Sequence, residues 1–165
     1  MRARRKHTDL ALEHALLQID EAYDSRSWHG TNLRGSLRGV SPHVAAWRPA
    51  PERHNIWELA VHAAYWKYAV RRRITGEKRG SFALAGSNWF RRPEAATAAA
   101  WKADLALLGS EHRQMRAVIA GLKATDLQKR TPPGPATVGF LVRGIAAHDL
   151  YHAGQIQILK RLCPY

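Results

Sequence analysis

Apolar side chains recur at steps of three and four along four stretches of the chain, and no stretch alternates apolar and polar residues as a half-buried strand does. In the first stretch, for example, Leu12, Leu16 and Ile19 fall on one helical face. We therefore predict four helices, at about residues 9–25, 55–75, 93–121 and 137–162. Four amphipathic helices of this length predict an all-α fold, a four-helix bundle.

Residues with strong preferences for helix ends mark several of these boundaries. Asn55, with Glu58 three residues later, is an N-cap signature, and Gly76 is a stop signal. Pro93 is favoured in a first turn, so we expect the third helix to open there. The connections on both sides of the second helix are long, with a short helical piece expected near residues 42–46, so simple up-down-up-down order is not required.

Composition adds the expectation of a single globular domain. The 165 residues are 45% hydrophobic and 24% charged, which is ordinary for such a domain. We expect residues 1–7 to be a disordered basic tail and residues 8–165 to be one bundle domain. The single cysteine, Cys163, excludes a disulfide framework and fits a reducing compartment. No apolar stretch is long enough for a signal peptide or a membrane span, so we expect a cytoplasmic protein with no membrane partner.

The formal net charge of +13 raises the possibility of nucleic-acid binding. The basic residues are scattered over all segments, and several fall near predicted helix C-termini, where cations are favoured. No basic stripe follows one helix. We therefore expect no specific nucleic-acid site.

Histidines stand where core residues are expected. The apolar stripe of the last helix reads Leu141, Ile145, His148, His152, Gln155, Leu159. His148 and His152 are four residues apart, which places both rings on one helical face with Cβ atoms about 5–6 Å apart. A buried imidazole without a partner is costly, so the pair needs either facing hydrogen-bonding side chains or a metal ion. His62 lies on the stripe of the second helix, and the three together predict a metal site with an open position.

Four further residues are candidates for a supporting role. Glu58 and Asp20 could accept the second N–H of a ligating histidine, although each could equally be a surface carboxylate. Trp66 lies one turn from His62 and could form a pocket wall. Gln155 could orient a substrate or could make an ordinary packing hydrogen bond.

Two other histidines have less specific positions. His112 lies on the core stripe of the third helix and could be a further ligand or a supporting group, although we favour an ordinary core histidine. His29 follows a tryptophan in a loop and could lie at the mouth of the site.

Two segments of the sequence resemble the DinB and YfiT-like superfamily of bacterial metal-dependent proteins. They are residues 55–66, NIWELAVHAAYW, and residues 148–156, HDLYHAGQI. The resemblance extends over about residues 8–162 in helix order and loop lengths. It implies a four-helix bundle in which one histidine from the second helix and two from the fourth bind a divalent ion; these match His62, His148 and His152.

The resemblance also implies a class of chemistry. Characterised members include transferases and isomerases that use low-molecular-weight thiols such as bacillithiol or mycothiol, others are described as metal-dependent hydrolases, and many are homodimers. We therefore expect a homodimeric metal-dependent enzyme that uses zinc or nickel to activate a thiol or water toward a small-molecule substrate, as a thiol transferase or a hydrolase. The alternative is a non-catalytic bundle protein that binds metal or nucleic acid.

Overall fold

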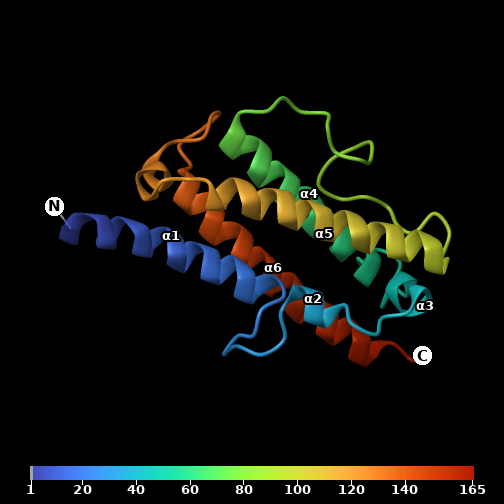
Figure 1. Cartoon of the computed structure of the whole chain (residues 1–165). Coiled ribbons are helices and arrows are strands. Elements are labelled where there is room, and N and C mark those ends of the chain that lie inside the picture. The colour runs from blue at the N-terminus through green and yellow to red at the C-terminus, as the bar shows by residue number, and fades with distance from the viewer. Residues whose placement is uncertain (1) are drawn as a thin grey trace.

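The computed structural model of the chain describes residues 2–165, with side chains from residue 10 onward. Within this range the long helices are α1 (Arg2–Tyr23), α4 (Ile56–Thr75), α5 (Ala98–Ala120) and α6 (Val138–Leu162) (Figure 1). Short helical turns in the connections are α2 (Leu33–Ser36), α3 (Pro42–Ala46) and the 3₁₀ turn η1 (Ala124–Gln128). No strand occurs in residues 2–165 apart from one isolated bridge, so the predicted all-α fold is confirmed.

The long helices pack in an order that differs from their order in the chain. Helix α6 lies between α1 and α4, α4 lies against α5, and α1 touches α5 more lightly. Helices α1 and α6 run in one direction and α4 and α5 run in the other (Figure 1). The long connections at residues 24–55 and 76–97 therefore carry the chain across the bundle, and the order is not simple up-down-up-down.

Most helix ends lie where local chemistry predicts them. The Asn55 side chain accepts a hydrogen bond of 2.8 Å from the backbone N–H of Glu58, and α4 ends at Gly76 with φ of 77°. The start of α5 is different, because the prediction of an opening at Pro93 is wrong. Helix α5 begins at Ala98, where the Thr97 hydroxyl accepts the N–H of Ala100 at 3.2 Å and supplies the cap.

The first helix begins earlier in the chain than expected. The backbone of α1 begins at Arg2, so residues 2–7, expected as a disordered tail, continue this helix. Met1 and the side chains of residues 2–9 lie outside the described part. The division into a tail and one domain stays a prediction.

Two apolar clusters fill the bundle. One surrounds α4 and α5 and includes Trp57, which is fully buried and donates its indole N–H to Asp104 at 2.6 Å. The other joins α1 to the first half of α6 and includes Ile19 and Ile145. None of the helices in the described residues has the length and apolar character needed to cross a bilayer.

Candidate metal centre

The structure brings His62, His148 and His152 together at one point. Helix α4 contributes His62 from its middle, and α6, which lies against α4, contributes the other two. The Nε2 atom of His148 is 3.1 Å from that of His62 and 3.0 Å from that of His152. All three ligand atoms lie within 4.8 Å of one another. Two helices and one i, i+4 spacing are therefore enough to assemble the cluster.

The outer nitrogens of two rings determine which atoms face inward. The Nδ1 atom of His62 is 2.8 Å from the backbone carbonyl of Asn88, and Nδ1 of His152 is 2.6 Å from the side-chain oxygen of Gln155. Because both oxygens can only accept, both Nδ1 atoms donate a proton. The Nε2 atoms of these two histidines therefore point lone pairs toward the centre.

With His148 included, the centre has more hydrogen-bond acceptor nitrogens than N–H protons to satisfy them. The Nδ1 atom of His148 is buried and has no hydrogen-bond partner among the described residues. If its Nε2 carried a proton, that proton could satisfy one neighbouring lone pair but not both. A cation at the meeting point of the three Nε2 atoms would satisfy all of them, so this donor set fits a metal ion.

The electrostatics keep these ligands neutral. Burial lowers the pKa of His62 to about 4 and that of His148 to about 3, and burial also lowers the pKa of His152. At neutral pH the cluster therefore holds three uncharged imidazoles, and a metal ion need not displace protons from them. Neutral imidazole suits zinc, nickel, copper and iron.

The irregular segment between α4 and α5 supports the site. The Trp89 ring stacks on His62 with centroids 3.7 Å apart and an angle of 10° between the planes. Its other face stacks on His54 at 3.6 Å, so Trp89 lies between two imidazoles. Asn88, which has a φ of 65°, accepts the Trp66 indole N–H at 3.0 Å on its side chain. Asn88 and Trp89 were not among the sequence candidates; the tolerance of asparagine for positive φ is the only local signal.

Two of the four supporting candidates lie at the centre. Gln155 holds the His152 ring, and the Trp66 ring lies 6.3 Å from that of His62 and 6.1 Å from that of His148. Tyr151, an exposed neighbour on α6, makes an edge contact with His152 at 5.1 Å. The structure thus surrounds the histidines with aromatic rings from three segments.

The two carboxylate candidates lie elsewhere. Glu58 pairs with Arg48 and with His54, at 2.9 Å from the His54 ring, and holds the connector that leads into α4. Asp20 pairs with Arg116 at 2.5 Å, between α1 and α5. Carbonyl and amide oxygens, rather than carboxylates, therefore orient the imidazoles.

The remaining candidate histidines are also outside the cluster. The buried His112 ring stacks on Tyr23 at 3.6 Å. His29 is exposed in the loop after α1, within 3.4 Å of the Ser27 hydroxyl. Neither residue adds a ligand to the three.

Comparison with known families matches one family over most of the chain. The family model described as the DinB superfamily matches residues 26–156, well over half of the 165 residues, and this span contains all three histidines. No curated protein and no solved structure matches the chain. The chain belongs to the DinB superfamily.

Proposed function

We propose that this member of the DinB superfamily is a metal-dependent enzyme in which His62, His148 and His152 bind one divalent transition metal, zinc or nickel. The observation that supports the proposal most directly is the convergence of three neutral imidazoles whose outer nitrogens are fixed as donors or left without a partner. Among the described residues the group contains no carboxylate and no thiol. Three histidines with one position left open are typical of a catalytic site.

The metal would act as a Lewis acid that lowers the pKa of a thiol or of water, so that either becomes a nucleophile at neutral pH. The chain itself contributes orientation. Asn88 and Gln155 hold two imidazole rings, while Trp89 covers one face of His62. Asp149, the carboxylate next to His148 on α6, is paired with Lys67 and is not available as a base.

The surroundings of the cluster favour a small substrate with an apolar part. Trp89 and Tyr151 are 37% and 65% exposed, so aromatic surface is available beside the histidines. A low-molecular-weight thiol with an electrophile would make the protein a transferase, and water with an ester or amide would make it a hydrolase. The contacts of the three histidines do not depend on this choice.

Metal analysis followed by an activity screen tests the proposal. The purified chain should hold about one transition metal, as expected for a three-histidine site. With zinc or nickel restored after chelation, it should turn over an electrophile with a small thiol, or an ester or amide with water, and His62→Ala should abolish that rate. His112→Ala is the matched control, because it removes a buried histidine from outside the cluster. Bound metal without any rate above that of free metal would instead support a non-catalytic metal-binding protein.

We also propose that the protein forms a homodimer through α6. One exposed face of this helix carries a stripe of apolar and small residues, flanked by the exposed Arg143 and Arg161; the stripe is formed by Phe140, Gly144, Ala147, Tyr151, Ile158 and Leu162. Phe140, Ile158 and Leu162 are each 59–60% exposed. This apolar stripe, on a chain with a net charge of +13, provides a surface on which two copies can meet with the arginines at its edge, and the small residues allow close approach.

Charge introduced into this stripe tests the dimer. Light scattering at micromolar concentration should give twice the chain mass for the natural protein and a monomer mass for Phe140→Glu with Ile158→Glu. Leu17→Glu is the control, because Leu17 is 56% exposed on α1, outside the stripe. A monomer mass for the natural protein would rule out the dimer.

A further inference from the structure

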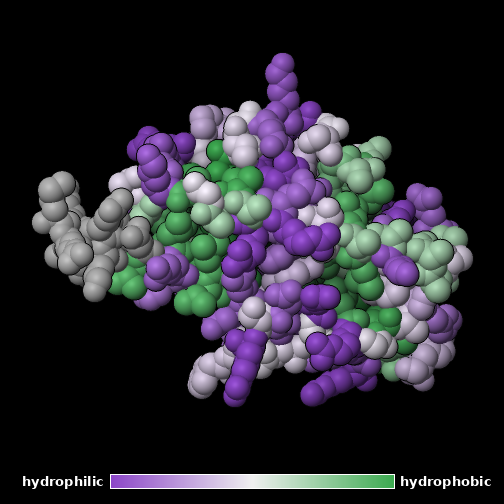
Figure 2. Space-filling view, viewed as in Figure 1, coloured by the Kyte–Doolittle hydropathy of each residue, from purple (hydrophilic) through white to green (hydrophobic). Residues whose placement is uncertain are grey.

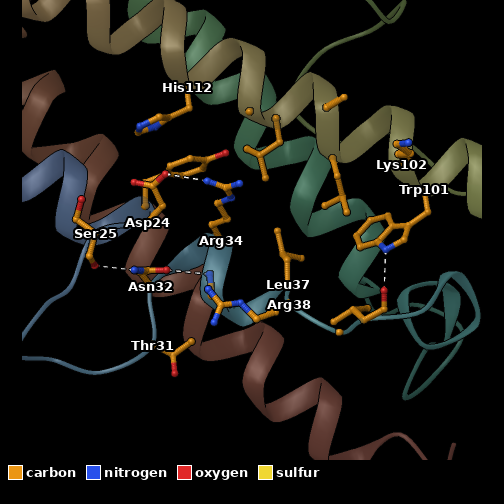
Figure 3. A pocket seen from close by; sticks show the side chains of 18 of the residues that line it. Asp24, Ser25, Thr31, Asn32, Arg34, Leu37, Arg38, Trp101, Lys102 and His112 are labelled. Carbon is orange, nitrogen blue, oxygen red and sulfur yellow. Dashed lines mark hydrogen bonds and ion pairs between the residues drawn. The ribbon is translucent and has the colours of Figure 1, made fainter.

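One concave feature of the molecule lies away from the metal centre and contains none of the three histidines. It is a cleft of about 1350 Å³ between α5 and the segment from the end of α1 through α2 to Val40. Figure 2 shows hydrophilic side chains gathered over the middle of this face, where α1, α2 and α5 come together. Figure 3 shows the two walls from close by: Trp101, Lys102 and His112 project from α5, opposite side chains of the loop and α2.

Contacts near both ends of the cleft connect its two walls. At one end the Trp101 indole N–H donates to the backbone carbonyl of Val40 at 2.8 Å. One turn beyond the other end, Arg116 pairs with Asp20 at 2.5 Å. These contacts tie α5 to the opposite wall, whereas α2 packs against α1 and α6. The two walls are therefore held at a fixed separation.

The floor of the cleft is apolar. Leu37, Leu105 and Leu108 line it. Gly109 lies among them in the interior of α5, where glycine costs about 1 kcal/mol relative to alanine. A Cβ atom at this position would lie 3.2 Å from the Arg113 guanidinium and 3.7 Å from the Tyr23 hydroxyl. A side chain at position 109 would therefore displace the Arg113 guanidinium, and Gly109 lets Arg113 lie close to the floor.

The rim of the cleft is strongly basic. The cationic lining residues are Arg26, Arg34, Arg38, Lys102 and Arg113. Among the lining residues Asp24 is the one carboxylate, and it pairs with Arg34 at 3.1 Å. Asp104, also on α5, is bound to Arg92 and Trp57 instead. The cleft consequently keeps a net positive charge over an apolar floor.

Two buried polar side chains also line the cleft. His112 is 4% exposed, and its Nδ1 atom is buried without a hydrogen-bond partner among the described residues. The Tyr23 hydroxyl lies beside Gly109. We propose that this cleft binds an organic anion, with a carboxylate or phosphate head on the basic rim and an apolar body over Gly109 and the leucines.

Binding of a fluorescent anion with an apolar body tests the proposal. Anilinonaphthalene sulfonate should bind the natural protein and should be displaced by decanoate or decyl phosphate, but not by decyltrimethylammonium, which has the same tail and the opposite charge. The relative potency of decanoate and decyl phosphate distinguishes a carboxylate ligand from a phosphate ligand. Displacement by the cation as effectively as by the anions would overturn the proposal, because the rim would then play no part. Stronger displacement by a short DNA duplex would also overturn it, in favour of a nucleic-acid surface.

Two pairs of variants locate the binding. Gly109→Leu should weaken binding of the displacing anion about tenfold or more, a loss of about 1.4 kcal/mol, by filling the floor. Ala117→Leu is its control, because Ala117 is exposed on the same helix and does not line the cleft. Lys102→Glu with Arg113→Glu should weaken binding similarly, whereas Lys78→Glu with Arg79→Glu changes the net charge equally outside the cleft and should have little effect.

The charge-reversal pair keeps the test decisive if Gly109→Leu does not fold, since Lys102 and Arg113 are exposed. Equal affinity in the cleft variants and in their controls would place the anion elsewhere and would refute the assignment.

Discussion

His62 on α4 and His112 on α5 are buried to a similar degree but have different neighbours. Both lie on the apolar stripes of adjacent helices, and they are 5% and 4% exposed. Burial lowers the pKa of His62 to about 4 and that of His112 to about 3. Nevertheless His62 meets two further imidazoles, whereas His112 stacks on Tyr23. Burial of a histidine therefore does not by itself create a metal site.

The difference arises from what lies across the bundle. Helix α6 packs against α4 and presents its i, i+4 histidine pair to His62. Near His112 the Lys67 ammonium, which lies 4.9 Å from the Tyr23 ring centre, contributes with Arg113 and Arg116 to the lowered pKa of His112. Lys67 also contributes to the lowered pKa of His148, so its charge does not distinguish the two regions. Lys67 pairs with Asp149, which follows His148 on α6, so this buried ion pair lies between the two regions.

The largest expected effect is on metal content. His148→Ala should remove the ring that joins the other two, so the metal should be lost on dialysis, which corresponds to at least a hundredfold loss of affinity. His112→Ala should retain the full amount. Elemental analysis of both variants measures this, and equal metal content in the two would break the distinction between the regions.

The next largest effect concerns the buried ion pair of Lys67 with Asp149, which lies between the regions around His62 and His112. Lys67 is fully buried, and Lys67→Met would leave the Asp149 carboxylate buried and unpaired, which should cost about 3–5 kcal/mol of the free energy of unfolding. Urea unfolding at neutral pH measures the loss. Lys102→Met, at an exposed position on α5, should change stability by no more than about 0.5 kcal/mol.

A double variant controls the interpretation of this loss. Lys67→Met with Asp149→Leu removes both charges together and should recover most of the lost stability, since an apolar pair can replace a buried ion pair. If the double variant is as unstable as the single one, the cost comes from packing and not from the unpaired carboxylate.

Much of the helical framework could be predicted from local chemistry. Periodicity located the long helices, and Asn55 and Gly76 predicted the ends of α4, because caps act through neighbouring residues. The predicted start of α5 was wrong, since the Thr97 hydroxyl supplies the cap four residues after Pro93, and Pro93 remains in the connector. Short-range preferences cannot rank two possible starts that differ in tertiary contacts.

The residues of the candidate site also divide into those with a local sequence signal and those placed by tertiary contacts. The three histidines could be found because each interrupts an apolar stripe, which is a property of its own helix. Asn88 and Trp89 could not be found, because their contacts with His62 depend on how an irregular segment returns over α4. The basic cleft had no sequence signal either, since its walls come from α5 and from a segment more than fifty residues earlier.

The burial of His112 should have a smaller effect, which appears in the pH dependence of stability. The folded protein holds His112 neutral with a pKa of about 3, while the unfolded chain protonates it near its ordinary value of 6.5. As pH falls below 6.5 the unfolded state binds a proton that the folded state does not, so stability present above that pH is lost toward the folded pKa. At about pH 4.5 this should amount to about 2.7 kcal/mol for one histidine, from two pH units at about 1.36 kcal/mol each.

The variant His112→Phe isolates this contribution, because it keeps an aromatic ring against Tyr23 and removes the titrating group. Urea unfolding of the metal-free proteins, near pH 7.5 and near pH 4.5, should show a smaller acid loss in the variant. The three clustered histidines titrate in both proteins and cancel in the difference. An identical acid loss in the two proteins would mean that His112 is protonated in the folded state.

The smallest expected effect concerns Trp89. Its ring stacks on His62, whereas His112 stacks on Tyr23 instead. The Trp89 ring stacks between His62 and His54, so it limits rotation of the His62 ring, but the hydrogen bond from His62 to the Asn88 carbonyl does not depend on the indole. Groups that orient metal ligands change affinity by about 10–100-fold, and Trp89→Leu should fall at the low end, about tenfold, because that hydrogen bond remains. Competition with a chelator measures the affinity of the purified variant. Trp28→Leu is the matched control, since Trp28 is fully exposed and should leave the affinity unchanged. Unchanged affinity in Trp89→Leu would show that the Asn88 carbonyl alone positions His62 and that the indole serves only to cover the ring.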